Sequence, residues 1–143
     1  MDDIAALTAV EAIKQLKARY FRTLDTKDWD GMREVFTEDV VVDTTGSGGA
    51  VVTGRGAFME FVSTHLADIL TVHHGHTPEI TLTSPTTATG VWAMEDRVRY
   101  PDGRELIAAG HYHETYDKSD GTWRIKTSKL TRLFMDLSEP AAG

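Results

Sequence analysis

The chain has 143 residues, enough for one compact domain and too few for two ordinary ones. It contains no cysteine, which excludes disulfides, a thiolate nucleophile and cysteine-ligated metal sites. Its formal net charge of −7 disfavours nucleic acid and anionic membrane surfaces as partners. Asp2 and Asp3 stand where a secretory signal would have basic residues, and no apolar stretch is long enough to span a bilayer. We therefore expect a cytoplasmic protein without a membrane segment.

The first predicted element is an amphipathic helix over about residues 8–24. Thr8 and Glu11 have the spacing of a capping box, which satisfies free amide groups at the start of a helix. Apolar residues then recur at steps of three and four and mark the inward face; they are Ile13, Leu16, Tyr20 and Leu24. Basic residues are expected to cover much of the remaining surface; they are Lys14, Lys17, Arg19 and Arg22.

Two more helices and one strand are predicted before residue 71. A short helix is expected to begin near Asp28 and to bury Trp29, Met32, Val35 and Phe36. Three valines at 40–42 are typical of a strand, and the glycine-rich residues 46–49 predict a turn or loop. A third helix is expected over about residues 56–70, with Gly54 and its neighbours as its cap.

From about residue 71 the hydrophobic period changes from 3.6 to two. Strands are predicted over residues 71–82, 87–100, 104–117 and 122–134, separated by short turn signals. Long strands joined by tight turns form an antiparallel meander. We therefore expect an α+β fold in which a curved, mixed or antiparallel sheet wraps around three helices, with residues 137–143 frayed.

Alternation along the second long strand places one acidic residue among apolar ones. The residues that share this face are Trp92, Met94, Asp96 and Val98. A carboxylate on an apolar face needs a charged partner or a wet cavity. By spacing alone, both a salt bridge at the sheet edge and a place in a pocket remain open for Asp96.

The histidines do not form a metal-binding pattern. His111 and His113 share one strand face but have no third ligand at a fitting spacing. His74 and His76 share a face that His73 does not, so neither face offers the three or four ligands that zinc takes. We therefore expect no metal site. One inward histidine is better suited to carry a proton, because imidazole titrates near neutral pH.

Several stretches, in this order, resemble the SnoaL-like branch of the nuclear transport factor 2-like superfamily over nearly the whole chain. They are Ala18-Arg19-Tyr20, residues 24–30 (LDTKDWD), residues 36–40 (FTEDV), residues 71–74 (TVHH), Gly110-His111-Tyr112 and residues 120–125 (DGTWRI). The resemblance extends to scytalone dehydratase, bile acid 7α-dehydratase and hexachlorocyclohexane dehydrochlorinase. It implies a pocket enclosed by the curved sheet and the first helix.

The resemblance also implies catalytic residues. Asp25 and His73 match an aspartate near the end of the first helix and the histidine with which it pairs. Tyr20 matches a dehydratase tyrosine, and Asp96 matches a further pocket aspartate, which favours the pocket for Asp96. The implied chemistry is removal of a carbon-bound proton by His73, which needs no cofactor.

Two positions depart from the pattern of these relatives. Ser128 stands where many have an arginine on the last strand, so Lys129 and Arg132 are the open substitutes for its charge. Trp92 stands where a scytalone-type pocket has a second histidine, which disfavours a scytalone-like substrate.

The predicted pocket lining is apolar and suits a flat hydrophobic molecule such as a steroid, terpenoid or polyketide-like ring. Its residues are Val42, Phe58, Trp92, Met94 and Tyr112, with Leu66 as a further candidate. Three functions remain open: a dehydratase-like lyase, an isomerase or cyclase using the same base, and a small-molecule-binding domain without turnover. The resemblance also favours a homo-oligomer, a dimer or a trimer.

Overall fold

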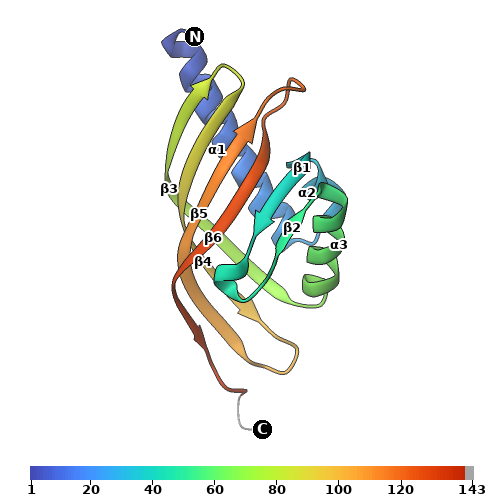
Figure 1. Cartoon of the computed structure of the whole chain (residues 1–143). Coiled ribbons are helices and arrows are strands. Elements are labelled where there is room, and N and C mark those ends of the chain that lie inside the picture. The colour runs from blue at the N-terminus through green and yellow to red at the C-terminus, as the bar shows by residue number, and fades with distance from the viewer. Residues whose placement is uncertain (141–143) are drawn as a thin grey trace.

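The computed structural model describes residues 1–140 and contains helices in the first half and a large sheet (Figure 1). The helices are α1 (Asp3–Asp25), α2 (Trp29–Arg33) and α3 (Arg55–Leu66), with a short 3₁₀ helix η1 (Thr45–Ser47). The strands are β1 (Phe36–Asp43), β2 (Val51–Thr53), β3 (Leu70–Ser84), β4 (Thr87–Arg99), β5 (Glu105–Asp117) and β6 (Arg124–Leu137).

The strands form one open sheet in the order β2-β1-β6-β5-β4-β3. The pairs from β3 to β6 are antiparallel, which confirms the predicted meander, and β1 joins it parallel to β6. Helix α1 runs along one face of the long strands, and α3 lies beside β1 and β2 (Figure 1). The α+β fold with a curved sheet around N-terminal helices is therefore confirmed.

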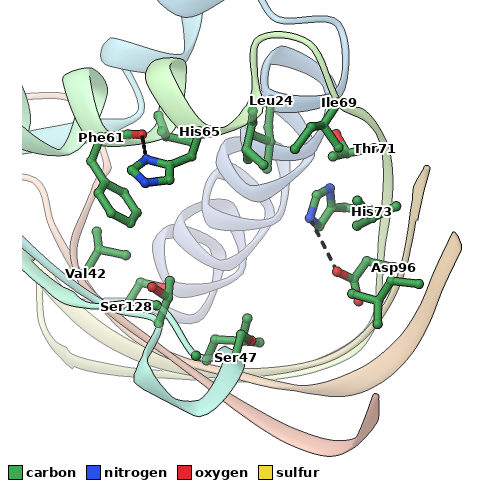
Figure 2. Close-up of a pocket in the computed structure, with 18 of the residues that line it drawn as sticks. Leu24, Val42, Ser47, Phe61, His65, Ile69, Thr71, His73, Asp96 and Ser128 are labelled. Atoms are coloured by element: carbon green, nitrogen blue, oxygen red, sulfur yellow. Dashed lines mark hydrogen bonds and ion pairs between the residues drawn. The ribbon is translucent and has the colours of Figure 1, made fainter. Parts of the chain in front are cut away.

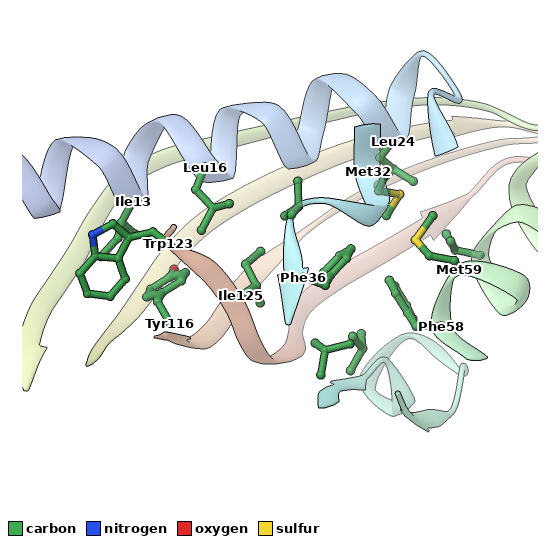
Figure 3. Close-up of a cluster of buried hydrophobic side chains, with 14 of the residues drawn as sticks. Ile13, Leu16, Leu24, Met32, Phe36, Phe58, Met59, Tyr116, Trp123 and Ile125 are labelled. Atoms are coloured by element: carbon green, nitrogen blue, oxygen red, sulfur yellow. The ribbon is translucent and has the colours of Figure 1, made fainter. Parts of the chain in front are cut away.

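The main core lies between the helices and the inward face of the sheet (Figure 3). The predicted stripe of α1 packs there, because Ile13, Leu16 and Leu24 are at most 2% exposed. Ile125 of β6 and Phe36 of β1 meet these residues from the sheet. The 3.6-residue period of the helix therefore located its buried face correctly.

The beginning of α1 differs from the prediction. The helix starts at Asp3, and the carboxylate of Asp2 accepts a hydrogen bond from the Ala5 amide at 2.7 Å. The hydroxyl of Thr8 lies inside the helix and donates to the carbonyl of Ile4 at 2.8 Å, so the capping box is wrong. The first two turns of α1 consist mainly of exposed residues. They lack the apolar stripe from which the start of the helix was predicted, so the prediction began too late.

Several other boundaries also differ. Helix α2 ends at Arg33, so Val35 and Phe36 are buried outside any helix and Phe36 begins β1. Helix α3 ends at Leu66, four residues before the expected end, and the short strand β2 was not predicted. Gly54 is confirmed as the residue that caps α3, with a φ of 98° that favours glycine.

The end of the chain is more ordered than expected. Leu137 is still part of β6, and the Ser138 hydroxyl accepts a hydrogen bond from the Glu105 amide at 3.0 Å. The expected fraying is therefore wrong at these two residues, and its last part, residues 141–143, lies outside the described residues. Within residues 1–140, no helix has the length and hydrophobicity needed to cross a membrane.

Candidate active site

A cavity of about 360 Å³ opens between α1, α3 and the inward face of the sheet (Figure 2). Of the predicted lining residues, Val42, Phe58, Leu66 and Tyr112 reach it. Trp92 and Met94 are a correction: both side chains are buried in a neighbouring cluster and do not line this cavity. They share the inward face as predicted, but other side chains cover them.

Asp25 and His73 are in contact, although 48 residues separate them. Asp25 is the last residue of α1, and its Oδ1 lies 2.7 Å from Nδ1 of His73 on β3. Its Oδ2 accepts the backbone amide of His73 at 2.8 Å, and Thr71 donates its hydroxyl to Oδ1 at 3.0 Å. Because a carboxylate only accepts, the Nδ1 atom of His73 carries the proton in this contact. Nε2 is then the basic nitrogen.

The same contacts keep Asp25 ionised. Burial by itself would raise the pKa of this carboxyl group. The hydrogen bonds from the ring and amide of His73, the charge of His73 and the hydroxyl of Thr71 together outweigh burial. The pKa of Asp25 therefore lies below its usual value, and the carboxylate can stabilise an imidazolium at His73.

Asp96 lies opposite His73 in the pairing of β3 with β4. Its Oδ2 is 3.8 Å from Nε2 of His73, and its side chain is 3% exposed. Arg132 of β6 binds both carboxylate oxygens, with Nη1 to Oδ1 at 2.7 Å and Nη2 to Oδ2 at 3.1 Å. Asp96 thus has the salt bridge and the pocket position at once, and the bridge lies inside the sheet because β4 is not an edge strand.

Arg132 reaches Asp96 across the intervening strand β5, which has a glycine at the position paired with Arg132. Gly110 of β5 pairs with Arg132 on one side and with Met94 on the other. A β-bulge follows, since Leu133 has no partner between the pairs of Ala109 and Gly110. An added Cβ at Gly110 would lie 1.9 Å from the Thr131 carbonyl oxygen, so only glycine fits there.

The question left open at Ser128 is thereby answered. Arg132 points into the cavity, and its Nε donates to the hydroxyl of Ser47 at 2.7 Å. Lys129 is exposed and does not line the cavity. The basic side chain that β6 brings to the cavity is therefore Arg132, which lies four residues further along the strand than Ser128.

Two tyrosines form one wall of the cavity. Tyr20 of α1 and Tyr112 of β5 both line it, with their rings edge to face and their centroids 5.8 Å apart. Burial raises the pKa of Tyr20 and also the pKa of Tyr112. Both phenols are therefore neutral and able to donate hydrogen bonds at physiological pH.

A second polar group, here called the core cluster, lies behind these tyrosines. Lys17 was predicted on the surface, but its side chain is 0% exposed and Nζ binds Glu114 Oε2 at 2.9 Å. The ammonium lies 4.0 Å from the ring centroid of Tyr20 and 3.6 Å from that of Tyr112. The rest of the cluster extends from Glu114 through hydrogen bonds of 2.8 to 2.9 Å and comprises Ser128, Tyr116 and Trp92.

Sequence reasoning also missed residues that line the cavity. His65 of α3 and Ser47 of η1 both reach it, as does Ser128 (Figure 2). His65 follows Phe61 by four residues, which places both side chains on one face of the helix. This spacing was the signal in the sequence that His65 faces the cavity. Ser47 lies in a glycine-rich turn whose path a sequence pattern does not specify.

The remaining histidines lie on the outer face of the sheet. His74 and His76 are exposed beside Glu95, and His111 and His113 also alternate away from the cavity. Across residues 1–140, no three histidine, aspartate or glutamate side chains gather closely enough to hold a metal ion.

Comparison with known proteins identifies the family of this fold. Residues 5–129 match the SnoaL-like domain. Probable cyclase FGR4 from Gibberella zeae is 22% identical over 141 residues, covering 90% of this chain and 94% of that protein. A candidate scytalone dehydratase from Novosphingobium aromaticivorans superposes with a TM-score of 0.87 at 24% identity, covering 99% of this chain and 95% of that chain.

A third protein has the same fold at still lower sequence identity. Hexachlorocyclohexane dehydrochlorinase LinA-type3 from Novosphingobium barchaimii superposes with a TM-score of 0.85 at 15% identity, covering 99% of each chain. At these identities the two superpositions establish a shared fold and nothing finer. The domain match spans most of the chain, so this protein belongs to the SnoaL-like family.

Proposed function

We propose that the protein is a cofactor-free lyase of the dehydratase type that acts on a hydrophobic small molecule. The observation that carries the proposal is the 2.7 Å contact between Asp25 Oδ1 and His73 Nδ1, with His73 lining an apolar cavity. Asp25 itself does not line the cavity. It therefore acts on the substrate only through the imidazole, by setting its tautomer and stabilising its protonated form.

In the proposed reaction, His73 Nε2 removes a proton from a substrate carbon. The bond between the neighbouring carbon and its hydroxyl oxygen breaks as the new double bond forms. The proton held at Nε2 then passes to the departing oxygen, so water leaves and the imidazole returns to its neutral state. General acid–base assistance of this kind contributes about 10²–10⁴-fold to the rate.

Three other side chains have supporting roles in this proposal. Tyr20 donates a hydrogen bond to the departing or enolising oxygen, because burial keeps its phenol protonated. Asp96 positions a substrate hydroxyl or shares the proton near Nε2. Arg132 binds both carboxylate oxygens of Asp96 and so fixes this side chain beside His73.

The cavity walls indicate the substrate class. Its volume of about 360 Å³ lies within the usual range of small-molecule sites, about 300–1,000 Å³. The walls are mostly apolar and include Leu24, Phe58, Phe61, Val62, Ile69 and Leu130. Flat ring systems of the steroid, terpenoid or polyketide type would bury their faces against such walls.

A cyclase or isomerase that uses the same base is the second candidate. It is favoured by the similarity over 94% of a protein named as a probable cyclase. Loss of water or hydrogen halide from the substrate would indicate a lyase, whereas a product of unchanged mass would indicate isomerisation or cyclisation. Mass spectrometry of products from a panel of hydroxylated and halogenated ring compounds separates the two.

Substitutions in the dyad test the proposal directly. Asp25→Asn and His73→Ala should each lower turnover of the substrate found in that panel by about 10²–10⁴-fold, with ligand affinity within a few fold. His74→Ala is the matched control, since His74 lies next in the chain but faces outward, and it should keep full turnover. Turnover that survives both dyad substitutions would refute the dyad, and a wild-type protein that binds ligands without turnover would support a binding domain.

The expected homo-oligomer remains a proposal. Apolar residues are exposed on the outer face of the sheet, and Val72, Ile107 and Phe134 are among them. A second copy could cover this surface. Sedimentation equilibrium would distinguish a monomer, a dimer and a trimer.

A further inference from the structure

His65 is a second pocket histidine, and it lies on the side of the cavity away from His73 (Figure 2). Its ring packs against that of Phe61 at an interplanar angle of 36°, with the centroids 4.3 Å apart. Nδ1 lies 2.7 Å from the Phe61 carbonyl oxygen, one turn earlier in α3. A carbonyl oxygen only accepts, so Nδ1 carries the proton and Nε2 of the neutral ring is an acceptor.

Ser128 lies on the same side of the cavity as His65 in Figure 2. Its hydroxyl proton is committed to Glu114, because Oγ donates to Oε2 at 2.8 Å. A serine hydroxyl has one proton and two lone pairs, so only lone pairs remain for the cavity. Like Nε2 of His65, this oxygen can accept a hydrogen bond and cannot donate one.

The two sides of the cavity therefore differ in their hydrogen-bonding character. His73, Asp96 and Arg132 bring charged groups to one end of the cavity, whereas away from them His65 and Ser128 each present a lone pair. Apolar side chains such as that of Leu24 lie between His65 and His73 (Figure 2). Among residues 1–140, His65 Nε2 has no hydrogen-bond partner and Ser128 Oγ has none besides Glu114. His65 is an exposed residue, so water also reaches its ring at the mouth of the cavity.

From this asymmetry we infer that the His65 side is a hydroxyl-binding subsite. The ligand is a flat apolar molecule that carries a hydroxyl group on the end remote from His73, and this hydroxyl donates to Nε2 of His65. A carbonyl or ether oxygen at the same position would face these lone pairs and form no hydrogen bond, so such a ligand should bind less tightly. The inference rests on the proposed function for the identity of the reacting end.

Three naphthalene probes of nearly equal shape test the subsite by equilibrium binding. They are 2,6-dihydroxynaphthalene, 6-methoxy-2-naphthol, which replaces one donor by an ether, and 2-naphthol, which has a single hydroxyl. Wild-type protein should bind the dihydroxy probe about tenfold more tightly than the methoxy probe, as measured by probe fluorescence. 2-Naphthol should resemble the methoxy probe.

Substitutions at His65 assign the preference. His65→Phe should reduce the tenfold ratio to about one, because its ring has the same shape without an acceptor. His65→Gln should retain a ratio of several fold, since the amide oxygen can accept, and it keeps the test open should the phenylalanine variant fold poorly. His74→Phe is the control on the outer face and should leave the ratio at its wild-type value.

The dyad and the subsite can fail separately. Asp25→Asn should keep the tenfold binding ratio even as it removes turnover. A wild-type ratio near one, no measurable binding of the dihydroxy probe, or a ratio unchanged in His65→Phe would each overturn the subsite. Loss of the ratio in His65→Phe alone would support it, whatever the outcome of the turnover experiments.

Discussion

Two polar clusters join helix α1 to the sheet, and they differ in their access to the cavity. The site cluster consists of Asp25, His73, Asp96 and Arg132, and all but Asp25 line the cavity. In the core cluster, by contrast, the Lys17 and Glu114 side chains are both 0% exposed, and neither lines it. Both clusters pair opposite charges over long sequence separations, but only the first places charged side chains at the cavity.

The comparison indicates what a buried charge contributes in each place. In the site cluster, acidic and basic side chains alternate from Asp25 through His73 and Asp96 to Arg132, and the last three border the cavity. In the core cluster, the hydrogen bonds to Glu114 satisfy the pair, which holds the tyrosine wall from behind. Tyr20 belongs to both regions, since it lines the cavity and lies over Lys17.

The largest change in stability should come from the core cluster. Lys17→Met leaves the Glu114 carboxylate buried without its cation, which should lower the free energy of unfolding by about 3–5 kcal/mol. Urea denaturation would measure this loss. Lys14→Met on the exposed side of α1 should stay within about 0.5 kcal/mol of wild type. A Lys17→Met protein as stable as wild type would contradict the assignment of an interacting buried pair.

In the site cluster, the corresponding substitution should cost somewhat less. Arg132→Met removes both hydrogen bonds to Asp96, and we expect a loss of about 3 kcal/mol because water in the cavity can reach the carboxylate. Adding Asp96→Asn should recover part of this loss, since no buried charge then remains. Lys129→Met, an exposed neighbour on β6, is the control in the same denaturation series.

Gly75 of β3 packs against Phe21 of α1, and this contact can be tested by substitution. An alanine Cβ at Gly75 would lie 2.6 Å from Phe21 Cε2, and the Phe21 ring stacks on that of His73. Gly75→Ala should destabilise the protein by about 1–3 kcal/mol through overpacking, as measured by thermal unfolding. Gly56→Ala in α3 has no neighbour within 4 Å of the added Cβ and should instead be neutral or slightly stabilising. Equal effects at both positions would indicate that Phe21 moves freely.

The smallest expected effect is a dependence of stability on acid pH that traces to Asp25. Its pKa in the folded state lies below the ordinary value of 3.8, so its contribution is fully present above that pH. The contribution is lost as pH falls through the folded-state pKa. Unfolding free energies of wild type and Asp25→Asn, measured from pH 6 to pH 2, should therefore converge at the acid end. A constant difference between the two proteins over this range would contradict the assigned shift.

Local periodicity was sufficient for much of the site. The stripe of α1 placed Tyr20 on the inward face, and alternation grouped Asp96 with the apolar residues of its strand and separated His73 from His74 and His76. The family resemblance then assigned His73 to the pocket. These predictions held because the directions of side chains along a helix or strand repeat every 3.6 or two residues. The pairing of Asp25 with His73 came from the family resemblance, because no local pattern brings residues 48 positions apart together.

Other features depended on packing between distant elements. Lys17 was predicted on the surface because its partner Glu114 is 97 residues away, and no local pattern indicates such a partner. Trp92 faces inward as predicted, but other side chains separate it from the cavity. The path of Arg132 to Asp96 depends on the bulge at Leu133 and on the bare backbone at Gly110, which no pattern within β6 reveals.

The sequence by itself thus determined the fold class, the antiparallel meander and the inward faces of its helices and strands, because these follow from hydrophobic periods and turn residues. Only the tertiary structure decided which charges pair, which inward side chains border the cavity and that His65 joins them. Those outcomes depend on distances between elements that are far apart along the chain, and a one-dimensional pattern carries no such distances.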